Sequence, residues 1–510
     1  MHLGKIFSVQ TDLASSHIVE VEVDIHKSGL PSFSIVGLPD KAVEESRERV
    51  AAAIKNSGYD NPKRYKTVVS LSPADLKKEG PHFDLPIALG LLLANQDETL
   101  DFDSTGMCFV GELALDGSVR PVKGILALVQ HAASLGYASV YVPRDNASEA
   151  ALIQGIDVYP VTNLQQLVLH LGQINNQIQE PSLVIHPQPV TLYESVPINP
   201  TIDFAHIVDQ QHSKRSLLIA ATGGHNVAMY GPAGTGKTML AKAFAGILPP
   251  LTYEQMLEST AIHSYVGLLS DTHLRSAPYR APHHTSSYVS VIGGGTYPRP
   301  GEISLSHNGV LFLDEFPEFD KRVLESLREP MEDHEVRISR ARGSVTFPAR
   351  FILVAAMNPP SAVYRDPSSI TPAAIRSFSR KISGPIMDRI DIWTEVPKVE
   401  HEKLLNHPAI GPTSQELQQQ VLSGRERQYK RLGSGRTNAD MSVTEIEKHI
   451  VLDHDTKQLL DTSATKLDLS PRVYHKILKL SRTIADLDGS NQITQQHVLE
   501  ALSYRPRDIV

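Results

Sequence analysis

The pattern of apolar and polar positions predicts a mixed α+β domain over residues 1–175. Between positions 19 and 25, Val or Ile at each odd position alternates with Glu or Asp at each even one. This period of two is typical of a strand with one buried face. Comparable patterns predict strands at 32–36, 67–72, 107–111 and 139–142, and helices at 41–56, 85–93 and 125–135.

Residues 176–200 are expected to form a linker. The segment 173–200 is rich in Gln and Asn and contains five prolines, and proline disfavours helix in the residue before it. Strands then alternate with helices over residues 201–397, which predicts an α/β core. A helical domain is expected over residues 398–510, because that part contains a capping box at 442–445 and the helix start Ser470-Pro471.

Composition narrows the class of protein. The 510 residues carry 49 Lys and Arg against 57 Asp and Glu, a net charge of −8, so a nucleic-acid partner has to be sought in local charge. The single cysteine, Cys108, excludes an intramolecular disulfide and a multi-cysteine zinc site. The longest apolar run, 85–94, is about half of the ~20 residues of a membrane span. With no secretory signal pattern at the N-terminus, we expect a cytoplasmic protein without a membrane partner.

The segment 231–238 matches the phosphate-binding pattern G-x-x-x-x-G-K-[ST]. It follows an apolar strand at 227–230 and precedes a helix at 238–248, so its backbone N–H groups and the helix N-terminus are expected to surround phosphate. Lys237 would reach the β- and γ-phosphates of ATP, and Thr238 would bind Mg²⁺. The residues expected to bind the nucleotide are Gly231, Pro232, Ala233, Gly234, Thr235, Gly236, Lys237 and Thr238.

Two more buried strands end in polar side chains that suit ATP hydrolysis. The strand 309–313 is followed by Asp314, which would hold Mg²⁺, and by Glu315, which would deprotonate the attacking water. The strand 351–357 is followed by Asn358, which would hydrogen-bond the γ-phosphate or that water. The simpler alternatives are that the carboxylates cap the next helix and that Asn358 forms a turn.

The order of these motifs resembles an AAA+ ATPase. More closely, RAPHH (280–284), GEISLSHNGVLFLDE (301–315) and ISGPIMDRID (382–391) resemble the ComM/YifB family of magnesium-chelatase-like AAA+ proteins, over essentially the whole chain. The resemblance implies an AAA+ P-loop α/β core with a C-terminal helical lid, preceded by an α+β Lon-protease-like domain. It also implies a homohexameric ring that uses ATP for branch migration of DNA and promotes recombination during natural transformation.

The resemblance gives roles to two arginines. Arg389 matches the arginine finger, which reaches the γ-phosphate of the neighbouring subunit. Arg472 matches the sensor-two arginine of the lid, which reports on the γ-phosphate. The alternatives are a pairing of Arg389 with Asp388 or Asp391, and a solvated surface position for Arg472.

A basic hairpin and an insert are the expected DNA contacts. The segment 336–350 contains four arginines and no acid, and two short strands flank Arg340-Ala-Arg342, which matches the family's pre-sensor hairpin. Such arginines can follow a phosphate backbone without reading sequence, although a solvated hairpin or a subunit contact is the alternative. The segment 276–300 resembles the helix-two insert. The residues expected to contact DNA are Arg337, Arg340, Arg342, His283, His284 and Tyr288.

The two histidines are not expected to bind metal, because adjacent side chains converge poorly on one ion and no third ligand is evident. They could instead be structural or contact the DNA backbone. Tyr288 could stack on a base, although packing is an equal alternative.

Two departures from relatives limit the chemistry. Gly80–Asp84 and Val119–Leu126 resemble the catalytic segments of Lon-type proteases, but the serine position is His82 and the lysine position is Leu126, with Lys123 offset by three residues. We expect no peptidase activity, because acyl transfer lacks its nucleophile and base. Many relatives also carry cysteines after the sensor asparagine. Residues 358–367 contain none, so zinc is not expected there.

Three functions remain open from the sequence. The leading one is an ATP-driven motor that acts on single-stranded or branched DNA. A chelatase-type or chaperone-type ATPase that remodels a protein would share every nucleotide residue. A nucleotide-gated DNA-binding scaffold with weak hydrolysis is a third, and the intact Asp314, Glu315 and Arg389 count against it.

Overall fold

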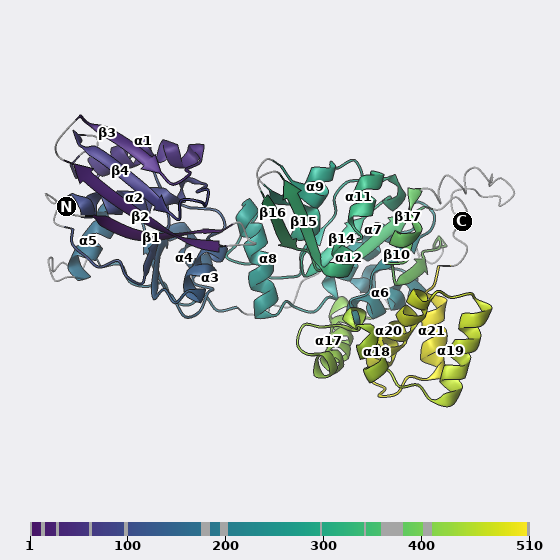
Figure 1. Cartoon of the computed structure of the whole chain (residues 1–510). Coiled ribbons are helices and arrows are strands. Elements are labelled where there is room, and N and C mark those ends of the chain that lie inside the picture. Colours follow the sequence, from purple (N-terminus) through teal and green to yellow (C-terminus); the bar gives the residue numbers. More distant parts are fainter. Residues whose placement is uncertain are drawn as a thin grey trace. The chain divides into compact units, whose positions relative to one another are not determined.

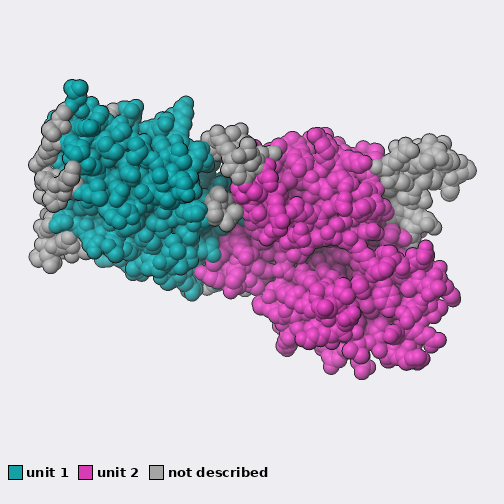
Figure 2. All heavy atoms as spheres, in the orientation of Figure 1, with its two compact units in different colours: residues 1–194, 260–273 teal, residues 195–259, 274–510 magenta. Residues whose placement is uncertain are grey.

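The computed structural model describes residues 3–11, 16–26, 30–60, 64–95, 100–174, 184–193, 202–295, 298–340, 343–358, 381–400 and 411–506. Figure 1 labels the elements. Figure 2 shows two compact units: residues 1–194 with 260–273, and residues 195–259 with 274–510. Helix α8 (Tyr253–Val266) is shared, since its residues from Thr260 onward group with unit 1. Part of the expected core range therefore belongs to the first unit.

The first sheet of unit 1 is largely antiparallel. Its strand order is β1-β2-β4-β3, and β3 is parallel to β4 while the other neighbours are antiparallel. The expected strand at 32–36 and helix at 41–56 are confirmed at those bounds. The elements are β1 (Gly4–Thr11), β2 (Ser16–His26), β3 (Ser32–Val36), β4 (Lys66–Ser72), α1 (Lys41–Asn56) and α2 (Asp84–Ala94).

The second part of unit 1 alternates short strands with helices. Strands β5, β8 and β9 form a parallel sheet, and β6 pairs with β7 in a hairpin. The sequence predicted the strand beginning at 107 but placed its end two residues too late. The elements are β5 (Met107–Phe109), β6 (Glu112–Leu113), β7 (Val119–Arg120), α3 (Ile125–Ser134), β8 (Ser139–Pro143), α4 (Ala147–Ala150), β9 (Asp157–Val161) and α5 (Leu164–Ile174).

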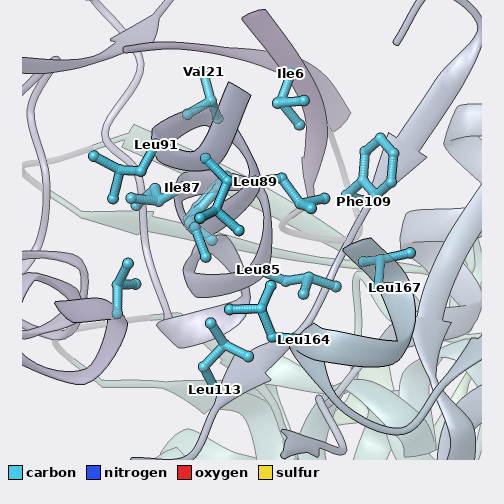
Figure 3. Close-up of a cluster of buried hydrophobic side chains, with 14 of the residues drawn as sticks. Ile6, Val21, Leu85, Ile87, Leu89, Leu91, Phe109, Leu113, Leu164 and Leu167 are labelled. Atoms are coloured by element: carbon cyan, nitrogen blue, oxygen red, sulfur yellow. The ribbon is translucent and has the colours of Figure 1, made fainter. Parts of the chain in front are cut away.

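The longest apolar run forms the core of unit 1. Helix α2 is buried on nearly all sides, and Figure 3 shows its leucine and isoleucine side chains among those of β1, β2, β5 and α5. A helix that is apolar all round belongs in a protein core when it is this short. Among the described residues, no helix has the length and hydropathy needed to cross a bilayer.

The middle of the expected linker is bound to unit 1. The backbone N–H groups of Ile185, Gln188 and Thr191 donate to His170 Nδ1 (3.1 Å), the Val158 carbonyl (2.7 Å) and the Ala151 carbonyl (2.9 Å). Residues 184–193 have no regular secondary structure. This segment is therefore attached along its length, while the rest of the expected linker lies outside the described residues.

The central sheet of unit 2 is parallel throughout. Its five strands lie in the order β11-β14-β17-β10-β18. Because the strands are parallel, their carboxyl ends share one edge of the sheet and their amino ends share the other. The strands are β10 (Val227–Tyr230), β11 (Tyr279–Arg280), β14 (Gly309–Leu313), β17 (Phe351–Met357) and β18 (Ile392–Glu395).

Shorter elements surround this sheet. Helices α6 (Gln211–Gly223) and α7 (Lys237–Gly246) flank β10 in the chain. The expected hairpin is confirmed as β15 (Glu335–Arg340) and β16 (Gly343–Pro348). The remaining elements are α9 (Tyr288–Ile292), β12 (Gly293–Gly294), β13 (Arg299–Pro300), α10 (Glu302–Leu305), α11 (Lys321–Ser326), α12 (Pro330–Asp333) and α15 (Gly384–Met387).

The described residues from 411 onward form a helical region, as the sequence predicted. The capping box of Ser442 and Glu445 is present, and Ser470 caps the helix that begins at Pro471. Helices α17 and α20 pack against α6, so this region is joined to the α/β core within unit 2. The helices are α17 (Ser414–Leu432), α18 (Val443–His449), α19 (His454–Lys466), α20 (Pro471–Leu487) and α21 (Gln495–Ser503).

A buried ion pair joins α1 and α2 in unit 1. Arg49 Nε lies 2.7 Å from Asp84 Oδ2, and Asp84 has no exposed surface. The hydrogen bond to Asp84 raises the pKa of Arg49. We expect Arg49→Ala to destabilise this unit by about 3–5 kcal/mol, because it leaves a buried carboxylate without its partner. Hydrogen exchange of the α1 and α2 amides measures the effect.

Arg47→Ala is the matched control for this prediction. Arg47 lies on the same helix, is half-exposed and is 3.4 Å from Glu48. We expect a change within about 0.5 kcal/mol, as is usual for surface positions. Equal protection in the two variants would contradict the stabilising role of the buried pair.

Candidate nucleotide site and arginine cluster

The glycines of segment 231–238 are required by the path of the backbone. Gly234 (φ +77°) and Gly236 (φ +92°) adopt left-handed conformations, which favour glycine. A Cβ on Gly231 would lie 2.3 Å from the carbonyl oxygen of Val396. The loop therefore turns tightly at the carboxyl end of β10 and leads into α7.

The loop brings together the side chains expected to bind phosphate and Mg²⁺. Lys237 is 7% exposed, and its Nζ donates to the carbonyls of Gly231 (3.0 Å) and Pro232 (2.7 Å). Burial lowers the pKa of Lys237. Thr238 Oγ1 donates to Asp314 Oδ2 at 2.9 Å. The hydroxyl and carboxylate thus meet at the sheet edge where parallel α/β proteins bind ligands.

Glu315 lies beside this pair and has an unexpected partner. Its backbone is left-handed (φ 51°), and its N–H donates to Asp314 Oδ1 at 2.9 Å. Its Oε2 lies 2.9 Å from Nδ1 of His284. From its position in the sequence, His284 is expected to contact DNA or to be structural. The structure instead places it on the candidate general base, because the chain after β11 passes the end of the adjacent strand β14.

Asn358 completes this edge of the sheet. It follows β17, which lies between β14 and β10. Its Oδ1 is buried without a hydrogen-bond partner among the described residues. Buried polar atoms are nearly always paired, so this oxygen fits a site completed by a ligand or its water. Residues 359–380, which include most of the segment where zinc is not expected, lie outside the described residues.

Arg389 and Arg472 lie at the opposite edge of the same sheet. Arg389 lies three residues before the start of β18, which pairs in parallel with β10 so that Ile392 faces Val227. The P-loop follows the other end of β10, and four strand residues span about 10–13 Å. Arg472, on α20, is joined to Arg389 by a shared partner. Both arginines therefore lie near the end of β10 opposite to the P-loop.

The shared partner is Glu332. Arg389 Nη2 lies 2.7 Å from Glu332 Oε2, and Arg472 binds the other carboxylate oxygen. Arg389 Nη1 also donates to the Pro385 carbonyl at 2.6 Å. Arg389 therefore pairs with Glu332, and neither of the aspartates considered from the sequence is its partner. Arg472 is 44% exposed, but it is held in an ion pair and is not a freely solvated side chain.

Asn226 fixes the backbone that carries Arg389. This residue directly precedes β10. Its side chain donates to the Arg389 carbonyl (3.2 Å) and accepts from the N–H of Leu353 (2.8 Å). Its own N–H donates to Asp391 Oδ2 at 3.1 Å. The start of β10, the start of β17 and the Arg389 segment are thus joined through one amide.

Comparisons with known proteins agree with these motifs. Sequence models described as magnesium chelatase, subunit ChlI; subunit ChlI of Mg-chelatase; and subunit ChlI C-terminal match residues 203–404, 21–146 and 411–505. YifB of Salmonella typhimurium is 41% identical over 494 residues, 96% of this chain and 94% of that protein. Competence protein ComM of Haemophilus influenzae is 41% identical over 511 residues, 99% of this chain and 98% of that protein.

The chain belongs to the ComM/YifB family of magnesium-chelatase-like AAA+ proteins. As a member of the ComM/YifB family it is an AAA+ ATPase of the chelatase type, for which ATP and Mg²⁺ are the expected ligands. More distantly, the DNA replication licensing factor Mcm6 of Drosophila melanogaster is 23% identical over 330 residues, 60% of this chain and 37% of that protein.

The arginine hairpin of this ComM/YifB chain has acidic neighbours that the segment 336–350 does not contain. Val336, Ile338 and Phe347 form its buried face. Arg337 is exposed on the other face, 3.6 Å from Glu329 and 3.5 Å from Glu335. The side chain of Arg340 and all of Arg342 lie outside the described residues. The charge at the hairpin tip therefore stays a prediction.

Arg350 belongs to the basic segment 336–350 in the sequence, but its side chain contacts the helical region. It forms an ion pair with Asp440 in the helical region, and Asp440 is also 3.4 Å from His334. The acidic partners of Arg350 and Arg337 lie outside the 336–350 segment in the sequence, so a count of that segment could not include them. The local charge of +4 is therefore partly neutralised.

The other expected DNA contacts lie in the insert. His283 Nδ1 is 2.8 Å from Thr285 Oγ1, and its ring is 4.2 Å from that of His284. The Tyr288 hydroxyl accepts from Ser326 Oγ at 3.3 Å, and Tyr288 is 36% exposed. The described residues contain no group of three side chains suited to a metal. His283 and Tyr288 are exposed, whereas His284 is 28% exposed and is paired with Glu315.

The protease-like segments of unit 1 are packed as structural elements. The His82 ring contacts the Val9 carbonyl at 3.1 Å, and burial lowers the pKa of His82 to about 4. Leu126 is fully buried in α3, whereas Lys123 is exposed. Burial raises the pKa of the Cys108 thiol to about 12, so this thiol is not a reactive nucleophile.

We expect His284→Ala to lower kcat for ATP about tenfold, equivalent to losing one charged hydrogen bond of about 1.5 kcal/mol. KM should change little, because His284 contacts Glu315 and not the phosphate-binding lysine. Steady-state ATPase kinetics measure both constants. His284→Asn retains a donor near the Nδ1 position and should keep most of the activity. Equal kcat for wild type and His284→Ala would show that this contact does not position Glu315.

Proposed function

We propose that this protein is an ATP-hydrolysing ring motor that acts on DNA, with branch migration as its reaction. The observation that supports the proposal is that the candidate residues for ATP hydrolysis lie at two opposite edges of the central sheet. Lys237, Asp314 and Glu315 lie at one edge, and Arg389 and Arg472 lie at the other. In this proposal two neighbouring chains form each complete site, which agrees with a closed ring of identical subunits.

Each candidate residue at the carboxyl ends of the parallel strands has its own role in the proposed reaction. Lys237 and the loop N–H groups hold phosphate oxygens, while Thr238 and Asp314 hold Mg²⁺. The metal, when bound, neutralises charge on the phosphates. Glu315 accepts a proton from the attacking water, and Asn358 orients that water or the γ-phosphate. The buried Asn358 oxygen, which has no partner among the described residues, supports this last role.

At the amino edge, the arginines act on the neighbouring chain. An arginine supplied across an interface stabilises the charge that develops during phosphoryl transfer. The separation of about 10–13 Å along β10 supports a role for these arginines on a neighbouring chain and not on the P-loop of their own chain. Hydrolysis then depends on assembly. One chain contains both sets of charged groups, but they lie at opposite edges of its sheet and would meet only across an interface between two chains.

The DNA part of the proposal rests on the hairpin and the insert. In the sequence, Arg340 is the last residue of β15 and Arg342 directly precedes β16, and Arg337 is exposed along the outer face of the hairpin. His283 and Tyr288 supply further accessible polar and aromatic groups. The names of two relatives, a competence protein and a DNA replication licensing factor, agree with DNA as the substrate.

A protein substrate is the second candidate. The matching sequence models are named for a subunit of magnesium chelatase, and a chelatase-type or chaperone-type ATPase would use the same nucleotide residues. The partial neutralisation of the 336–350 segment by Glu329, Glu335 and Asp440 favours this alternative more than the sequence alone does.

ATPase assays with and without single-stranded and branched DNA decide between the two. Under the proposal, DNA stimulates the wild type, and Arg340→Ala/Arg342→Ala loses most of that stimulation while its DNA-free rate is kept. Arg322→Ala, an exposed arginine paired with Asp320, is the control and should respond to DNA like the wild type. Absence of any stimulation in the wild type would reject DNA as the substrate.

Unit 1 is proposed to be a binding or assembly platform without peptidase activity. Its protease-like segments have His82 and Leu126 in place of a nucleophile and base, and both side chains are used in packing. A serine-directed activity probe should not label this unit. Specific labelling would contradict the proposal.

A further inference from the structure

The carboxylate of Glu332 binds the guanidinium groups of the two arginines to which a phosphate would bind. Its two oxygens bind Arg389 and Arg472, one each. Burial opposes the charge on Glu332, but the hydrogen bonds from the two arginines lower its pKa, so it is ionised at neutral pH. Carboxylate and phosphate oxygens bind guanidinium groups with the same geometry. An incoming phosphate would therefore compete with Glu332.

Cationic side chains line part of the cavity beside this pair. The cavity has a volume of about 370 Å³, within the usual range of small-ligand pockets. Helix α20 contributes Arg472, His475, Lys476 and Lys479 to its wall. Lys476 and Lys479 donate to backbone carbonyls at 2.7 and 2.8 Å. Because a carbonyl carries no net charge, these bonds do not neutralise the positive charge of the two lysines. The cavity suits an anion.

The other two carboxylates in the wall have cations of their own. Asp391 is 3.5 Å from His225 and 3.7 Å from Lys476. Despite burial, these partners lower the pKa of Asp391 to about 2. Asp440 binds Arg350 and lies near His334. Glu332 is therefore the carboxylate that balances the two arginines.

Arg389 is held back from solvent in this arrangement. Its side chain is 8% exposed, and its Nε is buried without a hydrogen-bond partner among the described residues. Buried guanidinium donors are seldom left unpaired. A phosphate that replaced Glu332 could also pair Nε, since a guanidinium binds oxyanions through two adjacent N–H groups.

We propose that Glu332 is the resident anion of a phosphate-binding cluster formed by Arg389 and Arg472, and that a phosphate of the neighbouring chain's nucleotide displaces it. This inference rests on the ring motor proposed above. Glu332 lies in the one-turn helix α12, which ends at Asp333 and is followed by His334 in a left-handed conformation, directly before the hairpin. Force on the hairpin would therefore pull on the same carboxylate.

Glu332→Gln keeps the shape of the side chain and removes its charge. The DNA-free ATPase rate should rise about fivefold, which corresponds to losing one half-exposed ion pair of about 1 kcal/mol. The rise should vanish when Arg389→Ala is added. Asp333→Asn removes the same charge one residue away and should leave the rate unchanged. A rate for Glu332→Gln at or below the wild-type rate would overturn the inference while leaving the motor intact.

A binding measurement tests the role of Glu332 independently of the proposed motor activity. In the Lys237→Ala background the P-loop is weakened, and inorganic pyrophosphate is titrated by calorimetry. Adding Glu332→Gln should tighten pyrophosphate binding about fivefold, and adding Arg389→Ala as well should abolish the gain. Unchanged affinity would reject the resident anion even for a protein without DNA-stimulated hydrolysis. A wild type without ATPase activity would reject the motor but not a positive binding result.

Discussion

Glu315→Gln is expected to bind ATP as tightly as the wild type and to lower kcat by about 10²–10⁴-fold, the usual contribution of a general base. The substitution keeps the side chain's size and removes its ability to take a proton from water. Lys237 and Thr238, which hold the phosphates and Mg²⁺, are unaffected, so binding persists. Nucleotide binding and single-turnover hydrolysis measure the two properties separately.

Glu318→Gln is the matched control for this result. Glu318 lies three residues further on, and its carboxylate is 2.6 Å from Lys381 and not from His284. It should hydrolyse ATP at the wild-type rate. Normal turnover in Glu315→Gln would show that another group takes the proton, and the assignment of Glu315 would then be wrong.

Arg389→Ala should lower kcat by about 10³–10⁵-fold, the range known for arginines supplied across an interface. ATP binding should be retained, since the substitution lies at the opposite sheet edge from the P-loop. ATPase assays under ring-forming conditions measure the loss. Arg322→Ala, an exposed arginine on α11, should have no comparable effect without DNA.

Mixing two inactive variants tests whether the arginine acts across the interface. Arg389→Ala has an intact P-loop, and Lys237→Ala has an intact arginine cluster. A mixed ring contains some interfaces that combine the two intact halves, so the mixture should hydrolyse ATP although each variant alone does not. A mixture that stays inactive while forming rings would mean that both halves must belong to one chain.

Local sequence signals predicted the elements whose stability is local. Helix α1 begins where Asp40 accepts from the N–H of Val43 at 2.8 Å and continues with regular apolar spacing. The P-loop was recognisable because its glycines are demanded by backbone geometry within eight residues. The hairpin was found because two alternating strands flank a short turn.

Contacts between distant residues could not be predicted in the same way. Strand β11 has two residues and no visible period, so nothing in the sequence indicated that the following His284 would meet Glu315. Glu332 is separated from Arg389 and Arg472 by 57 and 140 positions (389 − 332 and 472 − 332). Such ion pairs follow from the packing of whole elements and leave no local pattern.

The shortness of strand β10 has a consequence for the order of events around the proposed ring. One end of this four-residue strand carries the P-loop, and the other end carries Asn226, which holds the Arg389 backbone. A displacement at one end of so short and largely buried a strand is passed on to the other. Each subunit would then sense its own nucleotide and signal to its neighbour's, so that hydrolysis proceeds in sequence and not at random.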